Sequence, residues 1–248
     1  MSPLRGKTAI VTGASSGMGA ATVRALTGAG VTVAAGARRV DRLAELGDAV
    51  VAQRLDVTDR ASCEEFVEAA VVALGGIDIL VNNAGLALGR DPFWESDDED
   101  EATVLETNVA GLMRMTRLCL PHIRDGGHIV NIGSVAGRQA YPNAAVYVAS
   151  KYAVRGFTYA LREDLLGRPI HLTTVDPGLV ETDFSRVRFR GDADQAAAVY
   201  AGVEAIRPED IAECIVFALT RPPYVNVDEI VVKALAQSSG GRILRTED

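Results

Sequence analysis

Tyr147 and Lys151 stand four residues apart, in the segment Tyr147-Val148-Ala149-Ser150-Lys151, and could together move a proton. On a helix, this spacing puts both side chains on one face and within reach of each other. A phenol with a pKa near ~10 is a poor base at neutral pH, but a neighbouring ammonium stabilises the phenolate and lowers that pKa. We therefore predict that Tyr147 exchanges a proton with an alcohol or a carbonyl. The alternative is a surface helix that carries such a pair by chance.

Ser134 comes directly after residues 128–133, an apolar segment that we expect to form a strand. In open α/β sheets, ligands bind outside the carboxyl ends of the strands. The Ser134 hydroxyl could therefore hold the oxygen atom that exchanges a proton with Tyr147. Taken alone, an ordinary serine at a strand end is the simpler interpretation.

Residues 12–19 form a glycine-rich segment between an expected strand, residues 8–11, and an expected helix, residues 20–26. Glycines here permit a tight turn and let backbone N–H groups approach a pyrophosphate at the start of the helix. The spacing is Gly-x-x-x-Gly-x-Gly rather than the usual Gly-x-Gly-x-x-Gly, and a turn without any ligand is the alternative. The position between strand and helix favours a dinucleotide site. Its residues would be Gly13, Ser15, Ser16, Gly17, Met18 and Gly19.

The second expected strand, residues 31–35, runs into Gly36-Ala37-Arg38-Arg39, and the next acidic residue is Asp41. An NAD site places a carboxylate at this strand end for the ribose hydroxyls, whereas an NADP site places an arginine there for the phosphate. We expect Asp41 in the following helix, where it is badly placed for the ribose. Guanidinium groups bind phosphate through paired hydrogen bonds, so we predict NADP as the cofactor, held by Arg38 and Arg39. Two solvated surface arginines are the alternative.

Apolar strands alternate with helical segments along the whole chain. Further strands are expected near residues 50–55, 77–82, 127–133, 170–175 and 229–234, and further helices near residues 60–74, 98–123, 144–166 and 208–219. Strands that are apolar on both faces and separated by helices indicate βαβ units and a parallel sheet. We predict one α/β domain over residues 1–248, in which residues 183–206 break the alternation as an insertion. The helix before residue 170 is expected to stop at Gly167, and the last helix to open at Pro208.

The formal net charge of −8 argues against nucleic acid as a partner, because neutralising phosphates requires a basic face. The N-terminus has no apolar stretch typical of a secretory signal, and no run of about eighteen apolar residues predicts a membrane span. Three widely spaced cysteines (Cys63, Cys119 and Cys214) are interpreted as small buried residues in a reducing compartment. We therefore expect a cytoplasmic protein without membrane contact.

Taken together, these residues resemble the short-chain dehydrogenases/reductases over essentially the full chain. The segments that carry the resemblance, in the order and spacing of the family, are Gly13-x-x-x-Gly17-x-Gly19, Asn82-Asn83-Ala84-Gly85, Asn108, Ser134, Tyr147-x-x-x-Lys151 and Pro177-Gly178. The resemblance implies a Rossmann-type, doubly wound, seven-stranded parallel sheet with helices on both faces. It also implies a homo-oligomer, a tetramer or a dimer.

The resemblance further implies roles for single residues. Tyr147 looks like the general acid/base, and Ser134 like the group that orients the substrate oxygen. Lys151 resembles the residue that lowers the pKa of the phenol and holds the nicotinamide ribose, and Asn108 resembles the residue that anchors a water in the proton relay. Arg38 sits where NADP-using members carry their phosphate-binding arginine. Positions that resemble further contacts to adenine, ribose, pyrophosphate and carboxamide are Asp56, Val57, Asn83, Ala84, Gly85, Pro177, Gly178, Val180 and Thr182.

Residues 184–192 lie in the lid region, where family members differ most, and are similar to the NADP-dependent 3-hydroxy acid (serine-type) dehydrogenases, as are residues 81–89 and 177–180. This resemblance implies oxidation of serine, allo-threonine and short 3-hydroxy acids, or reduction of the matching semialdehydes. A substrate carboxylate would then meet Arg138, Arg188 or Arg190 through charge-assisted hydrogen bonds. For each of them, a surface or subunit-contact arginine is the alternative.

Two other functions are compatible with parts of the pattern. Residues 133–141 would line a pocket for a bulkier aldehyde or ketone as well as one for a small acid. A sensor or scaffold that binds NADP(H) without turnover would be expected to have lost one of Asn108, Ser134, Tyr147 and Lys151, and all four are present.

Overall fold

Seven parallel strands form a single sheet in the computed structural model, which describes residues 2–47 and 50–246. Their order across the sheet is β3-β2-β1-β4-β5-β6-β7. The strands are β1 (Thr8–Thr12), β2 (Thr32–Ala37), β3 (Val50–Arg54), β4 (Ile77–Asn82), β5 (Ile123–Ile132), β6 (His171–Pro177) and β7 (Glu229–Val232). Each of the strands predicted from the sequence is present, and the predicted parallel α/β fold is confirmed.

Helices follow most of the strands, as the alternation predicted. They are α1 (Gly17–Gly28), α2 (Val40–Ala44), α3 (Arg60–Leu74), α4 (Asp98–Leu105), α5 (Leu112–Cys119), α6 (Ala145–Asp164), α7 (Phe184–Arg188), α8 (Ala193–Ala198) and α9 (Pro208–Leu219). The helix expected over residues 98–123 is interrupted, because a π-helical turn, Glu106–Gly111, separates α4 from α5. α6 ends at Asp164, two residues before the expected end at residue 166, and Gly167 has a φ of +88° in the turn that follows.

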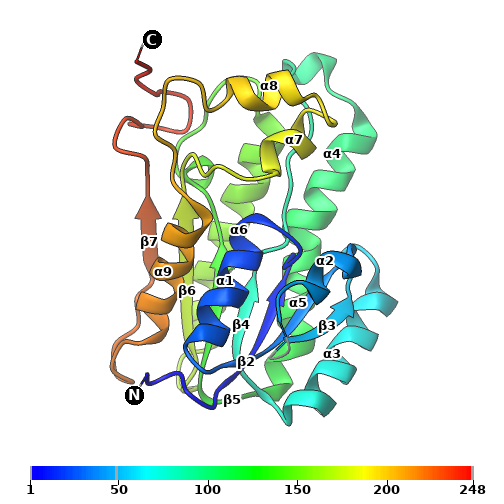
Figure 1. Ribbon diagram of the computed structural model, residues 1–248, viewed down its shortest axis with the longest axis vertical. Helices are drawn as coiled ribbons and strands as arrows, with labels where there is room; N and C mark the ends of the chain where they lie inside the picture. The colour runs from blue at the N-terminus through cyan, green and yellow to red at the C-terminus, as the bar shows by residue number, and fades with distance from the viewer. Residues whose placement is uncertain (1, 48–49, 247–248) are drawn as a thin grey trace.

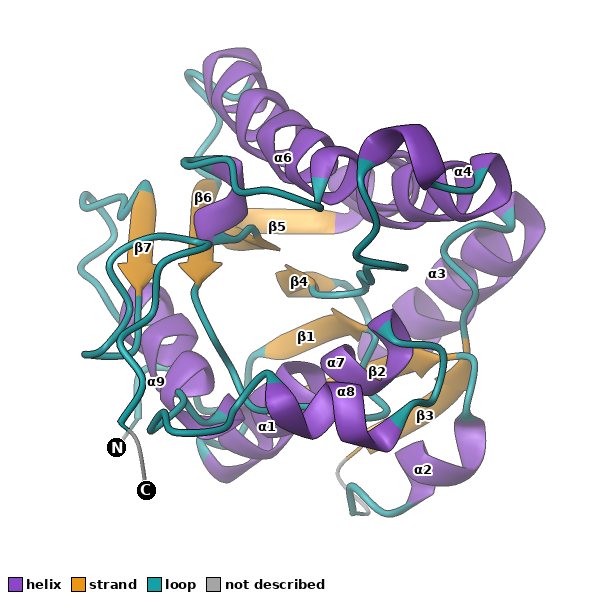
Figure 2. Cartoon of the chain, turned by 90° about the horizontal axis from the view of Figure 1, so that it is seen from above, coloured by secondary structure: helices purple, strands orange, loops and turns teal. Residues whose placement is uncertain are grey.

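The two faces of the sheet are apolar, as a doubly covered sheet requires. Along β1, Ala9 and Val11 contribute to one core cluster and Ile10 to the other, since successive side chains point to opposite faces. The first cluster packs against α1, α2 and α9, and the second against α3, α5 and α6. Figure 2 shows these two helix groups on opposite sides of the strands.

The order in which the chain adds strands to the sheet reverses between β1 and β4. From β1 the chain builds outward through β2 to β3, and it then returns to add β4 on the other side of β1. Such a switch point opens a crevice at the carboxyl ends of the strands, where ligands bind in this class of sheet. Residues 183–206, predicted as an insertion, carry α7 and α8 over that edge, at the top of Figure 1.

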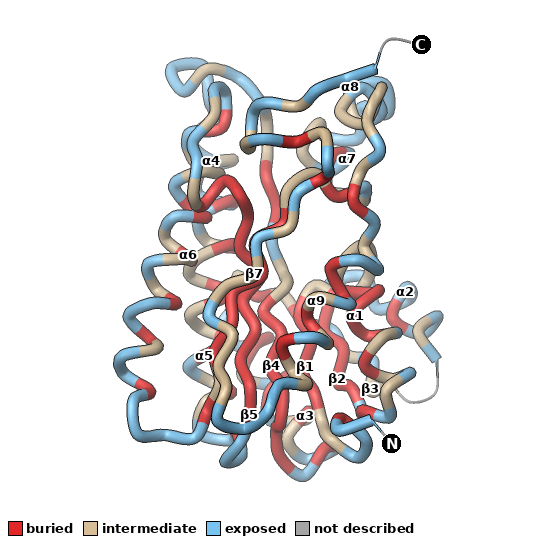
Figure 3. Tube along the Cα trace, turned by 90° about the vertical axis from the view of Figure 1, so that its left-hand side faces the viewer, coloured by how far each residue is buried: buried red, intermediate tan, exposed pale blue. Residues whose placement is uncertain are grey.

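Burial separates the sheet from the segment above it. The strands β1, β2, β4 and β6 are almost entirely buried, whereas the edge strands β3 and β7, α8 and most of residues 183–206 are half-buried or exposed (Figure 3). Cys63 and Cys119 are buried and Cys214 is half-buried, each within a helix, as expected. Within the described residues, no helix has the length and apolar character needed to cross a bilayer.

Candidate active site

The glycine-rich loop between β1 and α1 is held in a tight turn. Gly13 and Gly17 have φ values of +66° and +53°, which favour glycine. A Cβ atom on Gly19 would lie 2.3 Å from the carbonyl oxygen of Gly13, so this position admits no side chain. The amide of Asn83 fixes the loop by donating to the carbonyls of Thr12 and Gly13, at 3.0 and 3.1 Å. The loop therefore presents an open backbone surface at the start of α1, as a bound pyrophosphate requires.

A cleft of about 420 Å³ lies in front of this loop. It is lined by most of the residues predicted to bind the cofactor: Gly13, Ser15, Ser16, Gly17, Met18, Arg38, Arg39, Asp56, Val57, Asn83, Ala84, Gly85 and Thr182. Gly19 lies beneath the loop instead. Because Gly19 has no side chain, it leaves room for the loop and for the amide of Asn83.

Two arginines that come directly after β2 line one part of the cleft. Arg39 donates to the hydroxyls of Ser15 and Ser16, at 3.2 and 3.0 Å. Arg38 lies near Asp56. Burial opposes ionisation of the Asp56 carboxyl, but hydrogen bonds from Thr58 and the charges of Arg38 and Arg54 lower its pKa. The cluster of two guanidinium groups and two hydroxyls fits a phosphate on the adenosine ribose. Both arginines were predicted as cofactor ligands, and the structure places Arg39 as the one beside the serines.

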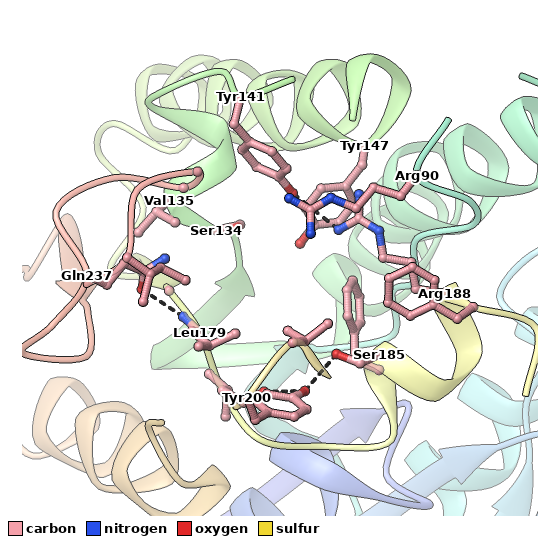
Figure 4. A pocket seen from close by; sticks show the side chains of 18 of the residues that line it. Arg90, Ser134, Val135, Tyr141, Tyr147, Leu179, Ser185, Arg188, Tyr200 and Gln237 are labelled. Carbon is pink, nitrogen blue, oxygen red and sulfur yellow. Dashed lines mark hydrogen bonds between the residues drawn. The ribbon is translucent and has the colours of Figure 1, made fainter. Parts of the chain in front are cut away.

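Ser134 and Tyr147 face a second cavity, of about 200 Å³. Ser134 follows β5, accepts a hydrogen bond from the N–H of Ala136 at 3.1 Å and donates to the carbonyl of Pro177 at 3.4 Å. Tyr147 lies in the first turn of α6, and its ring meets the edge of Phe184 from α7, with ring centroids 5.7 Å apart. Figure 4 shows both hydroxyls directed into this cavity. Strand end and helix start thus bring together the two groups that the sequence predicted to act on one oxygen atom.

Lys151 lies behind the cavity rather than in it. Its side chain is buried, its Nζ donates to the carbonyl of Ile132 at 3.0 Å, and it stands 5.9 Å from the centroid of the Tyr147 ring. Burial lowers the pKa of Lys151 to about 8, while the charge of Asp176 acts in the opposite direction.

Lys151 alone does not bring the pKa of Tyr147 below its ordinary value in this structure. Burial raises that pKa above its ordinary value, and the neighbouring Tyr141 acts in the same direction. The groups that lower it are the Ser134 hydroxyl and the charge of Arg188. A half-buried phenolate loses solvation, so the predicted lowering would need the positive ring of an oxidised nicotinamide in addition to Lys151.

Asn108 lies in the π-helical turn between α4 and α5 and is almost completely buried. Its amide bonds both backbone groups of Leu86, since Oδ1 accepts from the N–H and Nδ2 donates to the carbonyl, each at 2.8 Å. The same Nδ2 donates to Ser150 at 3.0 Å, and the Ser150 hydroxyl donates to the carbonyl of Tyr147 at 2.7 Å. Asn108 therefore joins the segment after β4 to the first turn of α6.

The turn after β6 divides between the two cavities. Gly178 and Val180 line the cavity of Ser134 and Tyr147, whereas Thr182 lines the cofactor cleft. Pro177 contributes its carbonyl to Ser134. Of the four residues predicted to contact the cofactor here, only Thr182 thus lines the cofactor cleft.

The three arginines considered as carboxylate ligands have different surroundings. Arg138 forms ion pairs with Asp176 at 2.7 Å and with Glu229 at 2.5 Å, so the prediction that it could meet a substrate was wrong. Arg190 is exposed and pairs with Asp100. Arg188 lines the cavity.

Sequence reasoning missed several residues that build the site. Buried Asp176 packs so closely on Gly133 that a Cβ atom there would lie 1.9 Å from its Oδ1, and no motif indicated this contact. Gln237 reaches the cavity from the C-terminal segment and accepts from the N–H of Leu179 at 2.9 Å. Tyr200 lines the cavity from the insertion and exchanges a hydrogen bond with Ser185 at 2.8 Å. Only the irregular sequence of residues 183–206 signalled that this segment was special.

A model of the short chain dehydrogenase family matches residues 7–193. The chain therefore belongs to the short-chain dehydrogenases. It is 41% identical, over the full length of both chains, to a protein of Schizosaccharomyces pombe named NADP-dependent 3-hydroxy acid dehydrogenase. A protein of the same name from Escherichia coli (strain K12) is 42% identical over 94% of this chain and 96% of its own.

Solved structures agree with this family and with the Rossmann-type sheet. The closed form of serine dehydrogenase complexed with NADP+ matches with a TM-score of 0.91 and 41% identity, over 97% of this chain and all of that one. An alcohol dehydrogenase from the archaeon Thermococcus sibiricus, complexed with 5-hydroxy-NADP, matches with a TM-score of 0.82 and 29% identity over 93% of this chain and 97% of its own.

Proposed function

We propose that this protein is an NADP-dependent oxidoreductase that transfers a hydride between nicotinamide and a short 3-hydroxy acid or β-hydroxy amino acid. The two relatives named above and the serine dehydrogenase complex support both the cofactor and the substrate class. The geometry that carries the proposal is the cavity beside the cofactor cleft, where Ser134 and Tyr147 meet.

The charge of this cavity favours an anionic substrate. Its lining contains three arginines, Arg90, Arg188 and Arg245, and no carboxylate. The chain as a whole carries a formal charge of −8, so a cavity whose charged lining residues, among those described, are all arginines departs from the rest of the molecule. Clefts lined by one sign of charge concentrate ligands of the opposite sign.

The residues of the cavity can move the proton that this reaction requires. In oxidation, the phenolate of Tyr147 accepts the hydroxyl proton of the substrate, and the Ser134 hydroxyl holds the same oxygen atom in place. A bound NADP would supply the acceptor for the hydride of the substrate carbon. Lys151 contributes a buried positive charge behind the phenol, and Asn108 fixes the turn that carries Tyr147. In the reductive direction, the phenol returns its proton to the carbonyl oxygen.

The residues that line the cleft would hold the cofactor. Arg38 and Arg39, with Ser15 and Ser16, would bind its ribose phosphate, and the glycine loop would bind its pyrophosphate. The Lys151 ammonium would hold the nicotinamide ribose. Tyr147 and the turn at Pro177, Gly178, Val180 and Thr182 would contact the nicotinamide end.

The wider organisation of the molecule is also part of the proposal. Residues 1–248 would form one domain, with residues 183–206 as the substrate lid. The protein would assemble as a homotetramer in the cytoplasm, without nucleic-acid or membrane partners. The resemblance to the family supports the assembly, and light scattering on the purified protein would measure it.

Reduction of a bulkier aldehyde or ketone is a weaker proposal, because a cavity of about 200 Å³ favours a small substrate. A silent NADP(H)-binding sensor is weaker still, because each group that the proton transfer needs is in place.

An assay of turnover tests the function. The purified protein is incubated with NADP or NAD and with serine, threonine isomers, 3-hydroxypropionate and neutral secondary alcohols, and reduced nicotinamide is followed. We expect turnover with NADP on the acids, and a loss of about 10³-fold in kcat for Tyr147→Phe, which removes the proton acceptor. Faster turnover with NAD, or turnover confined to neutral alcohols, would contradict the proposal. NADPH binding without any turnover would favour the sensor.

A further inference from the structure

The lid carries one cation into the cavity of Ser134 and Tyr147. We propose that this residue, Arg188, is the specificity determinant that binds the carboxylate of the substrate. The inference rests on the proposed function and adds the residue that selects acids over neutral alcohols.

Arg188 is fixed at the cavity wall by three hydrogen bonds. Its backbone carbonyl accepts from the N–H of Gly89 at 3.0 Å, and its Nε donates to the carbonyl of Gly89 at 3.1 Å. Its Nη1 donates to the hydroxyl of Tyr141 at 3.3 Å. The guanidinium carbon thereby lies 5.7 Å from the centroid of the Tyr147 ring. Figure 4 shows the guanidinium of Arg188 beside the Tyr147 ring, on one wall of the cavity.

No carboxylate among the described residues lies within ion-pair distance of Arg188, although acidic side chains such as Asp91 and Asp100 line a second cavity that Arg188 also faces. Both of its hydrogen-bond acceptors, a carbonyl and a phenol, are neutral, and it forms no ion pair within the described part of the chain. A guanidinium has five N–H donors, and these bonds use two of them. The remaining donors can form the two parallel bonds with which arginine binds a carboxylate. Because Arg188 is half-buried, such a pair is worth more than one at the surface.

The other arginines near the site are less suited to this task. Arg90 and Arg245 are exposed at the rim, and Arg245 donates to the carbonyls of Val199 and Ala201. Arg138 and Arg190 already have carboxylate partners. Arg188 therefore combines three properties that the others do not share: it lines the cavity, it is half-buried and it has no anionic partner among the residues described.

The proximity of Arg188 to the Tyr147 ring suits a short 3-hydroxy acid. In such a molecule, two carbon–carbon bonds separate the hydroxyl-bearing carbon from the carboxyl carbon. With its oxygen atom at Tyr147 and Ser134, the substrate can therefore reach the adjacent guanidinium without crossing the cavity. Because Arg188 belongs to α7, a bound carboxylate would also tie the lid to the catalytic residues.

The test compares an acid with its neutral isostere. kcat and KM are measured with NADP for 3-hydroxypropionate and for 3-hydroxypropanamide, in the wild type, in Arg188→Gln and in Arg188→Lys. We expect Arg188→Gln to raise KM for the acid about 100-fold and to leave KM for the amide within about twofold. Arg188→Lys keeps the charge but loses the paired geometry, so its KM for the acid should lie between the two. Arg186→Gln, an exposed position on the same helix, is the matched control and should behave as the wild type.

A second readout separates binding from a merely structural role. The charge of Arg188 lowers the pKa of Tyr147, so its removal should raise that pKa. The pH at which kcat for amide oxidation reaches its plateau should then move upward in Arg188→Gln. A mispacked lid would instead raise KM for both substrates alike, without moving this profile.

The outcomes distinguish a failure of the proposed function from a failure of the role assigned to Arg188. A wild type that does not prefer the acid to the amide contradicts the proposed function itself. A wild type that prefers the acid, with Arg188→Gln retaining that preference, overturns the inference and leaves the function standing. If Arg188→Gln does not fold or bind NADPH, Arg188→Lys decides, because an unchanged KM for the acid in that variant contradicts a paired contact.

Discussion

Two arginines stand at the same edge of the sheet and have opposite surroundings. Arg138, four residues after Ser134, is paired with Asp176 and Glu229, and Glu229 also accepts hydrogen bonds from Arg155 and Tyr159. Arg188, from the lid, has only neutral partners within the described residues. The first is the centre of a fixed network, and the second holds its charge toward an open cavity.

The difference shows how to separate a structural arginine from a binding one. A half-buried guanidinium is costly unless its charge is compensated, so Arg138 receives its compensation from the protein. Arg188 would receive it from the substrate. Residue type does not distinguish them. Their partners do.

The largest effect that would test this comparison is expected at Arg138. Arg138→Gln leaves Asp176, which is almost completely buried, without its cation, so the free energy of unfolding should fall by about 3 kcal/mol. The variant disturbs strand ends that support the cavity whichever substrate is bound. kcat/KM for an acid and for its amide should therefore fall together. Denaturant unfolding and steady-state kinetics measure the two effects. A change in selectivity for acids, without a loss of stability, would reverse the roles of the two arginines.

A smaller, pH-dependent effect is expected at Glu229, the other carboxylate of the network. Burial opposes its ionisation, but hydrogen bonds from Arg138, Tyr159 and Arg155 lower its pKa to about 2. A carboxyl whose pKa is lower in the folded than in the unfolded chain stabilises the fold above the unfolded value, and this stabilisation disappears as the pH falls through the folded value. Glu229→Gln should therefore reduce the free energy of unfolding at pH 7 by about 2 kcal/mol.

The difference between wild type and Glu229→Gln should shrink as the pH is lowered from about 5 toward 2. Unfolding at several pH values measures it. A difference that persists undiminished at the acid end would mean that Glu229 acts through packing rather than through its charge.

Much of the fold could be predicted from the sequence, because its signals are local. The alternation of apolar strands with helices predicts the parallel sheet, and each expected strand is present. The interruption at Glu106–Gly111 could not be predicted, because the π-helical turn depends on the bonds that Asn108 forms with Leu86, which is distant in sequence. Periodicity alone predicts a continuous helix there.

The same distinction between local signals and contacts of distant residues applies to the site. The meeting of Ser134 with Tyr147 could be predicted, because strand ends of a parallel sheet converge and family motifs mark both residues. The contact of Asp176 with Gly133, the reach of Gln237 and the partners of Arg138 all join distant parts of the chain. The burial that raises the pKa of Tyr147 likewise depends on the packed structure.

The most direct test of the account is a structure of the ternary complex. Tyr147→Phe would be crystallised with NADP and 3-hydroxypropionate, because the missing hydroxyl slows turnover while the cavity keeps its shape. The account predicts the hydroxyl of the acid beside Ser134 and residue 147, and its carboxylate in paired hydrogen bonds of about 3 Å with Arg188. A carboxylate that lies at Arg90 or Arg245, or that points to solvent, would contradict it.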